Sequence, residues 1–312
     1  MAELIPEIRV ERIDFGPPGT PVPVSIVIPT RDRGRGGLLD RLLEDLAGQS
    51  LPRFEVVLVI GDPRQGRAIN RGAREARGRI LVTMDDDTGI EGRALLENLV
   101  ALLDGNPDVG IAGASTVVPP EASWFQRLAS RQIPRRLFPV QKEIRDSDMA
   151  QHPCLAIRRD LFFAIGGEDE ELIRGLDPLL RHKVRRAGKR VVIAPDTAIS
   201  HPLPEGLPAL LRMYFRNGRG SGFAQRRFPE RIFNLDSGAR GDRFPVQIPL
   251  IRRVARYPVR LLHSLITLRW IRLGVELAYM TGWLWEFVAV RARARITSAS
   301  GPQIRVRFGR DD

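Results

Sequence analysis

Two hydrophobic patterns alternate along the first part of the chain, and they predict strands and helices in turn. Continuous apolar runs, typical of strands that a sheet buries on both faces, occur at residues 24–28, 54–60, 79–84 and 109–112. Apolar residues at helical spacing occur between these runs, at residues 38–46, 67–77 and 94–103. This order favours an α/β fold with a mostly parallel central sheet.

The pattern becomes less regular after residue 112. Residues 116–150 are rich in proline and arginine and predict a loop or lid. Residues 178–186 then predict a helix and residues 191–194 a strand. A further helix is expected to begin at residues 209–215, whereas the glycine- and arginine-rich residues 218–245 are expected to be mobile.

The C-terminal part has a different character. Residues 273–290 form an 18-residue, mostly apolar run that contains Glu276 and Glu286. The run is barely long enough to span a membrane, and two charges at membrane depth are costly, so a span is disfavoured. An amphipathic helix on an anionic membrane surface and a helical hairpin packed on protein both remain open. The arginines that flank the run are Arg260, Arg269, Arg272, Arg291, Arg293 and Arg295.

These changes in pattern predict three parts of the chain. They are an N-terminal segment (1–23), an α/β domain (24–240) and a basic, amphipathic helical extension (241–312).

Composition narrows the class of protein. With 312 residues, of which 43% are hydrophobic and 28% charged, the chain is typical of a globular protein. Its single cysteine, Cys154, excludes a disulfide framework and a thiolate metal site. Residues 1–16 lack the apolar core of a secretion signal, so we expect a cytoplasmic protein. The net charge of +12 attracts polyanions such as nucleotide phosphates, anionic lipid or nucleic acid.

Three carboxylates follow the apolar run at residues 79–84. Asp85 and Asp87 point to the same side while the backbone is extended, and Asp86 lies between them. Three like charges at a strand end repel one another unless a cation lies among them, and oxygen ligands of this kind suit Mg²⁺ or Mn²⁺. The triplet therefore predicts a divalent-metal site at the carboxyl end of a strand, where α/β sheets bind ligands.

Other interpretations of the same residues exist. The triplet is also compatible with a solvated acidic turn or with the start of a haloacid-dehalogenase-type phosphatase, although the lysines lack the context that such a phosphatase needs. A basic nucleic-acid-binding protein is the alternative without catalysis. That class explains the charge but not the carboxylates, which repel phosphate unless a metal is bound, so we expect no nucleic-acid partner.

Several further motifs surround the triplet in a fixed order. They are SIVIPTRDR (25–33), GRAINRG (66–72), CLAIRRD (154–160), LDPLL (176–180), RAG (186–188), APD (194–196) and the histidine at 201. Taken together with the triplet, they resemble the family 2 glycosyltransferases of the GT-A fold over roughly two thirds of the chain, from residue 24 to about residue 222.

The resemblance implies a set of site residues. The nucleotide diphosphate would be chelated by a Mn²⁺ or Mg²⁺ ion on Asp87, with His201 as a candidate second metal ligand. Asp177 would be the base that removes a proton from the acceptor hydroxyl. The residues implied in substrate binding are Pro29, Thr30, Arg31, Asp62, Asn70, Asp85, Asp86, Arg216 and Arg219.

Spacing selects Asp177 over Asp169 as the base. The family's base lies eleven residues before a helix-ending glycine and eighteen before the proline of a Pro-Asp pair, and Asp177 has this spacing to Gly188 and Pro195. Residues 168–170 then fall in a turn that is usually solvated. The family's glutamate before the base is replaced here by Leu176.

The resemblance implies the inverting transfer of a single sugar from a nucleotide-diphospho-sugar to an acceptor hydroxyl. The Gln-x-x-Arg-Trp motif of processive polysaccharide synthases is absent from the sequence, which favours one sugar per encounter. We expect a glycan or lipid-linked acceptor, a role in cell-envelope glycan or glycolipid synthesis, and peripheral attachment to the cytoplasmic face of the membrane. The sequence does not determine which sugar is transferred, which nucleotide base the donor carries or the oligomeric state.

Overall fold

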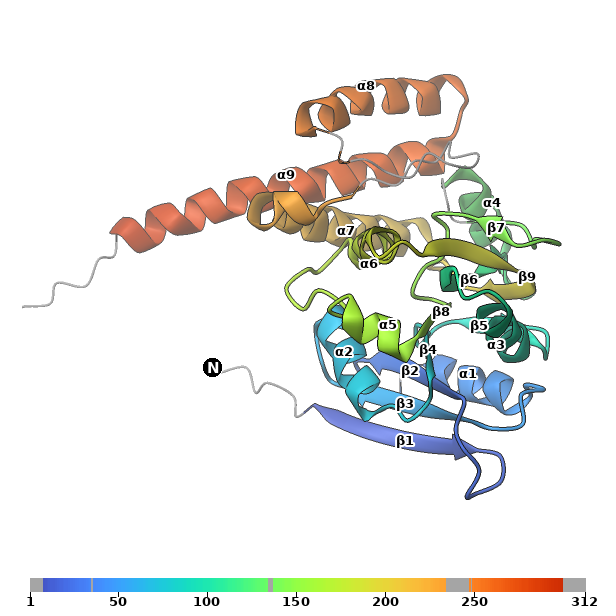
Figure 1. Cartoon of the computed structure of the whole chain (residues 1–312). Coiled ribbons are helices and arrows are strands. Elements are labelled where there is room, and N and C mark those ends of the chain that lie inside the picture. Colours follow the sequence, from blue (N-terminus) through green and yellow to red (C-terminus); the bar gives the residue numbers. More distant parts are fainter. Residues whose placement is uncertain (1–7, 35, 134–136, 234–246, 248, 300–312) are drawn as a thin grey trace, which may run out of the picture.

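The computed structural model describes residues 8–34, 36–133, 137–233, 247 and 249–299, with the side chains of 289–299 excepted (Figure 1). In this part of the chain the strands form one sheet in the order β1-β3-β2-β4-β8-β6-β9-β5, and β7 pairs with β9. The strands are β1 (Arg9–Phe15), β2 (Val24–Thr30), β3 (Phe54–Ile60), β4 (Ile80–Thr83), β5 (Gly89–Glu91), β6 (Val109–Val117), β7 (Arg145–Asp146), β8 (Leu155–Arg158) and β9 (Arg190–Ser200).

Helices cover both faces of the sheet, and further helical elements lie beyond one end of it (Figure 1). The helices on the sheet are α1 (Leu38–Ala47), α2 (Gln65–Glu75), α3 (Leu95–Gly105), α5 (Arg159–Ala164) and α6 (Leu176–Arg186). The remaining helical elements are α4 (Trp124–Gln132), α7 (Leu207–Arg227), η1 (Pro229–Arg231), α8 (Leu250–Ile266) and α9 (Trp270–Ala299). The expected α/β fold with a C-terminal helical segment is therefore confirmed.

The central strands are apolar throughout because both sides of the sheet are buried. All seven residues of β3 are buried, and leucines of α1 and α3 pack with one face of β2 and β3. On the opposite face, residues of α2, α5 and α6 pack against β4, β6 and β8. Two-sided burial removes the alternation of polar and apolar residues that a half-exposed strand would show.

The sheet is mixed, which corrects the expectation of a mostly parallel one. Strands β3, β2 and β4 are parallel, as are β6 and β9. Strand β8 is antiparallel to both β4 and β6, between which it lies, because the chain returns to the sheet through the long segment after β6. The N-terminal segment also contributes strand β1, which pairs antiparallel with β3 and which the sequence analysis did not predict.

A buried carboxylate ties together the amino-terminal ends of these strands. Glu55 on β3 is fully buried and accepts hydrogen bonds from Ser25 Oγ (2.5 Å), from the backbone N–H of Arg77 (2.7 Å) and from Arg77 Nε (2.7 Å). Arg12 Nε of β1 lies 3.2 Å from the same carboxylate. One side chain thus joins β1, β2, β3 and the end of α2.

We expect Glu55→Ala to lower the free energy of unfolding by about 2–3 kcal/mol, because it leaves the buried Ser25 hydroxyl and the Arg77 backbone N–H without an acceptor, whereas the guanidinium groups of Arg12 and Arg77 are partly exposed and stay hydrated. Glu75→Ala is the matched control, since Glu75 is exposed and lies 3.9 Å from Arg12. It should cost less than about 0.5 kcal/mol. Urea unfolding of both variants measures the difference, and equal costs would contradict the assigned role of Glu55.

Helix α7 continues through the glycine-rich residues that the sequence analysis expected to be mobile. A Cβ atom on Gly218 would overlap the carbonyl oxygen of Tyr279, and one on Gly282 would overlap that of Phe215. Helices α7 and α9 therefore approach backbone to backbone (Figure 1). The expectation of mobility was wrong for residues 218–227 because these glycines permit close helix packing.

Helix α9 begins within a small core of its own. Ile271 and Val275 pack with Ala129 and Ile133, at the end of α4, and with Leu210 of α7. Helix α4 lies inside residues 116–150, which were expected to be irregular, and it starts with a capping box between Ser123 and Gln126.

The two glutamates of the apolar C-terminal run are buried in ion pairs. Glu276 lies 3.0 Å from Arg272 and 3.1 Å from Arg260, and Glu286 lies 3.3 Å from Arg226. These pairs hold α9 to α8 and α7. The side chains of the flanking Arg291, Arg293 and Arg295 lie outside the described residues, as do residues 234–246, so the boundary at residue 240 stays a prediction.

Candidate metal and sugar-nucleotide site

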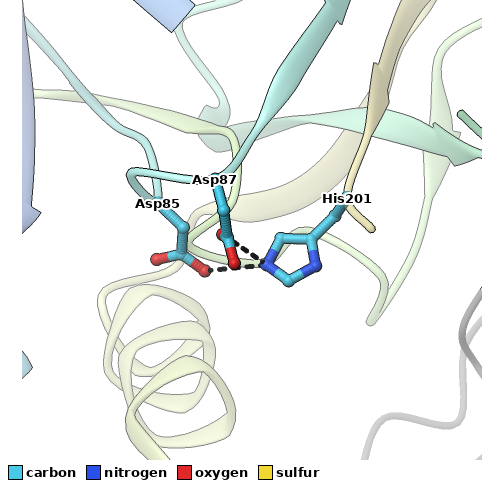
Figure 2. A group of neighbouring side chains, drawn as sticks. All are labelled: Asp85, Asp87 and His201. Carbon is cyan, nitrogen blue, oxygen red and sulfur yellow. Dashed lines mark ion pairs between the residues drawn. The ribbon is translucent and has the colours of Figure 1, made fainter. Parts of the chain in front are cut away.

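Two carboxylates and an imidazole meet at the carboxyl ends of β4 and β9. His201 Nε2 lies 3.0 Å from Asp87 Oδ1 and 3.6 Å from Asp85 Oδ2 (Figure 2). One ligand atom from each residue lies within 4.8 Å of the others. The three side chains are 19–25% exposed, which leaves the group open on one side.

Short strand β5 brings these residues together. It follows the acidic loop directly and pairs antiparallel with the end of β9, so that Gly89 lies opposite Ser200. A Cβ atom on Gly89 would lie 2.6 Å from Ser200 Oγ, so a larger residue there would require the Ser200 side chain to move. This pairing sets Asp87, two residues before β5, beside His201, the residue after β9.

The chemistry of this donor set fits a divalent cation. Oxygen atoms of two carboxylates and one imidazole nitrogen suit Mn²⁺, and carboxylate oxygens also suit Mg²⁺. Three protein ligands leave coordination positions for phosphate oxygens. Within the part of the chain that the structure describes, no other group of three or more acidic, histidine or cysteine side chains brings its ligand atoms within 4.8 Å of one another.

Neighbouring side chains hold the acidic loop in place. Asp86 is buried and accepts a hydrogen bond from Thr30 Oγ1 at the end of β2 (2.7 Å). Asp85 Oδ1 accepts one from Gln65 Nε2 at the start of α2 (2.9 Å). Asp86 thus points into the fold, whereas Asp85 and Asp87 face His201.

The other predicted substrate-binding residues lie around this loop with different surroundings. Pro29 is half-buried at the end of β2, and Arg31 beyond it is exposed. Asp62 is buried and engaged by Arg67, whose Nε lies 2.8 Å from Oδ2. Asn70 exchanges hydrogen bonds with the backbone of Glu168 (2.8 and 3.0 Å), so it holds the segment before α6.

Arg216 and Arg219 lie on helix α7 and not on a loop. Arg219 faces α9, where its Nη2 lies 3.7 Å from Glu286. If these arginines contact a diphosphate, they do so from positions set by helix α7 and not by closure of a loop.

Asp177 lies at the start of α6, next to the segment that carries His152. Its Oδ1 accepts hydrogen bonds from the backbone N–H of His152 (2.7 Å) and contacts His152 Nδ1 (2.5 Å). The other ring nitrogen, Nε2, lies 2.8 Å from Glu168 Oε1. The side chain of Asp177 is 32% exposed, while those of His152 and Glu168 are buried.

Residues 152 and 153 contact both the acidic loop and Asp177. Thr83 Oγ1 and Thr88 Oγ1, on either side of the acidic loop, donate to the carbonyl oxygens of His152 (3.3 Å) and Pro153 (3.1 Å). Because His152 also binds Asp177, residues 152–153 connect the acidic loop directly to the start of α6.

Sequence reasoning missed two members of this group. Glu168 was assigned to a solvated turn, but it is buried between His152 and Asn70. That interpretation was wrong because the turn packs against α2, where Asn70 exchanges hydrogen bonds with the backbone of Glu168. His152 had no motif spacing to support it, and nothing in the sequence pattern pairs it with residues 16 and 25 positions away.

Comparisons with known proteins agree with the motifs. Residues 61–166 match the family model described as Glycosyl transferase family 2. The O-antigen biosynthesis protein RfbC of Myxococcus xanthus is 27% identical over 233 residues, which cover 61% of this chain and 18% of that protein. The uncharacterized protein y4gI of Sinorhizobium fredii (strain NBRC 101917 / NGR234) is 26% identical over 240 residues, or 59% of this chain and 24% of that protein. The chain thus spans about a fifth of the length of these curated relatives.

Among solved structures, the mannosyltransferase PcManGT from Pyrobaculum calidifontis in complex with GDP-Man and Mn²⁺ aligns with 91% of this chain and 77% of that chain. The identity is 19% and the TM-score 0.48, a likeness that assigns neither sugar nor nucleotide. The family match covers the acidic loop and the segments on both sides of it. Residues 61–166 therefore match glycosyltransferase family 2, the family that the order of the motifs predicted.

Proposed function

We propose that this chain transfers one sugar from a nucleotide-diphospho-sugar to an acceptor hydroxyl, with inversion at the anomeric carbon. The observation that carries the proposal is the meeting of Asp85, Asp87 and His201, joined through residues 152–153 to Asp177. One group suits a metal-bound diphosphate and the other suits a base, and the reaction needs both.

In this proposal Asp87 and His201 hold a Mn²⁺ or Mg²⁺ ion, and Asp85 completes its surroundings. The bound ion would stabilise negative charge on the leaving nucleoside diphosphate. Asp177 takes the proton of the acceptor hydroxyl while that oxygen forms a bond to the anomeric carbon. The bond to the diphosphate breaks on the opposite side of the sugar, so one displacement inverts the configuration.

The remaining residues border the donor in this proposal. Pro29, Thr30 and Arg31 follow β2, and Thr30 also holds Asp86. Asp62 and Asn70 shape the segments around α2 through their buried contacts. Charge supports a role for Arg216 and Arg219 on α7, because guanidinium groups suit phosphate.

A thermal-shift screen tests the donor class. We expect at least one nucleoside diphosphate to raise the melting temperature only when Mn²⁺ is present. At a hundred times its Kd, such a ligand stabilises the native state by about 2.7 kcal/mol, which corresponds to a rise on the order of 5 °C. If none of the common nucleoside diphosphates shifts the transition with Mn²⁺, the proposed donor is wrong.

We also propose that helix α8 attaches the protein to an anionic membrane near a glycan or lipid-linked acceptor in the cell envelope. Helix α8 is amphipathic, yet its apolar stripe faces solvent: Ile251, Val254, Val259, Leu262 and Ile266 are 48–78% exposed. Its packing side carries Tyr257 and Ser264, and Arg260 binds Glu276 of α9. A solvent-facing apolar stripe flanked by arginines is typical of helices that lie on acidic lipid.

The name of the relative from O-antigen biosynthesis supports an envelope glycan as acceptor. Among the described helices, none combines the length and apolar character that crossing a membrane requires. Attachment at the surface is the form that the stripe on α8 supports, and we propose the cytoplasmic face.

Vesicle co-sedimentation tests the attachment. The protein should bind vesicles that contain phosphatidylglycerol and should dissociate as salt increases, because each arginine near such a surface contributes on the order of 1 kcal/mol. Replacing Ile251 and Ile266 together with aspartate should reduce binding at least about tenfold, since each buried isoleucine contributes roughly 1.5–3 kcal/mol. Ile173→Asp, at an exposed isoleucine outside α8, is the control. Equal binding of the double variant and the control would contradict the role of α8.

A further inference from the structure

We propose that His152 is a positioning residue for the transfer reaction: as an imidazolium held between Glu168 and Asp177, it keeps the Asp177 carboxylate ionised and turns its Oδ2 toward the acceptor. The role in transfer rests on the proposed function above. The charge state of His152 does not, and it can be measured without turnover.

The two carboxylate oxygens of Asp177 have different surroundings. Oδ1 accepts both the backbone N–H of His152 and the contact from Nδ1 of the same residue. Within the described residues, Oδ2 accepts no hydrogen bond. Since about a third of the side chain is exposed while its partners are buried, Oδ2 is the oxygen that an acceptor hydroxyl can reach.

Both ring nitrogens of His152 face carboxylate oxygens, and this determines the charge of the ring. A neutral imidazole carries one proton, so one nitrogen lone pair would point at a carboxylate lone pair. A doubly protonated ring donates to both partners, at 2.5 Å and 2.8 Å. Burial opposes the charge, but Asp177 and Glu168 outweigh it and raise the pKa of His152 well above its ordinary value.

The positive charges around Asp177 favour its ionised form. Arg181 of α6 is fully buried near Asp177, and it is balanced by Asp148, which also binds Arg185. Burial alone would raise the pKa of Asp177, but His152 and Arg181 hold that pKa far below its ordinary value. Asp177 is therefore ionised at neutral pH, as a base that accepts a proton from the acceptor must be.

A direct test uses the unmodified protein. In a long-range proton–nitrogen NMR spectrum at pH 8, both ring nitrogens of His152 should carry protons. His182 is the internal control, because burial and the neighbouring Arg186 and Arg185 lower its pKa, and its ring should be neutral. Spectra of His182→Asn, His201→Asn and His263→Asn assign the signals of the four histidines. A neutral His152 ring at pH 8 would overturn the inference, even if the protein proves to be a glycosyltransferase.

The role in the reaction is tested by His152→Asn, whose amide can still donate to Asp177 but carries no charge. Without the positive charge the pKa of Asp177 rises, so the acid limb of kcat should move to higher pH by about one unit or more. We expect kcat to fall on the order of tenfold with KM for the donor nearly unchanged. His182→Asn should leave the acid limb in place, and an unmoved limb in His152→Asn would overturn the role.

A second variant keeps the test decisive if His152→Asn does not fold. Glu168→Gln preserves the shape of the side chain and removes one of the two carboxylates. The His152 ring should then lose its second proton at a lower pH than in the unmodified protein. An identical titration would show that Glu168 does not support the imidazolium.

Discussion

Asp87→Ala is expected to abolish Mn²⁺-dependent binding of nucleoside diphosphate and, with it, sugar transfer. Asp87 contributes the carboxylate oxygen nearest to His201, at 3.0 Å, and the remaining pair would have to hold the ion without it. Changes outside the ligand shell of a metal already cost 10–100-fold in affinity, so the loss of a ligand should cost at least about 100-fold. Calorimetric titration with and without Mn²⁺ measures the loss.

Asp40→Ala is the matched control, because Asp40 is an exposed aspartate in the first turn of α1 and does not belong to the group of Asp85, Asp87 and His201. It should bind nucleotide as the unmodified protein does, and both variants should melt cooperatively. Near-native, Mn²⁺-dependent affinity in Asp87→Ala would remove Asp87 from the proposed metal site.

Asp177→Asn is expected to reduce kcat by on the order of a hundredfold or more, the scale typical of losing a general base. Donor affinity should change little, because the acceptor and not the diphosphate meets Asp177 in this account. The amide has nearly the shape of the carboxylate, so the loss reports chemistry and not packing.

Asp169→Asn separates the two candidate carboxylates. Asp169 accepts the backbone N–H groups of Glu171 and Leu172 (2.9 Å each) and pairs with Arg231 at 2.9 Å. Its substitution should lower the melting temperature and leave kcat nearly unchanged. The reverse pattern, a silent Asp177→Asn and an inactive Asp169→Asn, would show that Asp169 is the base.

The sequence predicted the core of this protein well because the core strands consist of short, continuous apolar runs that can be recognised locally. Each apolar run at 24–28, 54–60 and 79–84 lies in a buried strand, since only a sheet covered on both faces requires such runs. The acidic triplet was placed at a strand end, and β4 does end just before it. Its partner His201 was selected by motif spacing, and the two lie in contact.

The features that were missed depend on contacts between distant segments. Strand β1 was missed because its sequence mixes charged and apolar residues, and it is held in the sheet by pairing with β3. The glycines of α7 resemble those of a flexible segment until α9 is placed against them. The group formed by Glu168, His152 and Asp177 exists only because three segments fold together, so no spacing rule could reveal it.

The exposed stripe of α8 illustrates the same limit. The sequence analysis considered membrane attachment and packing on protein for the most apolar run, residues 273–290, which lies in α9. That run packs largely against α7, whereas α8 directs its apolar residues outward. Hydrophobicity predicts what a helix can bury, but the fold decides which face is left for a partner.

The stereochemistry of the sugar tests the central claim most directly. Time-resolved proton NMR can follow the anomer formed when the enzyme, with Mn²⁺, cleaves an α-linked nucleotide sugar in the presence of an acceptor or of water. A single displacement assisted by Asp177 predicts that the β-anomer appears first and that Asp177→Asn forms it much more slowly. An α-anomer that appears first, or equal rates in the two proteins, would contradict the account.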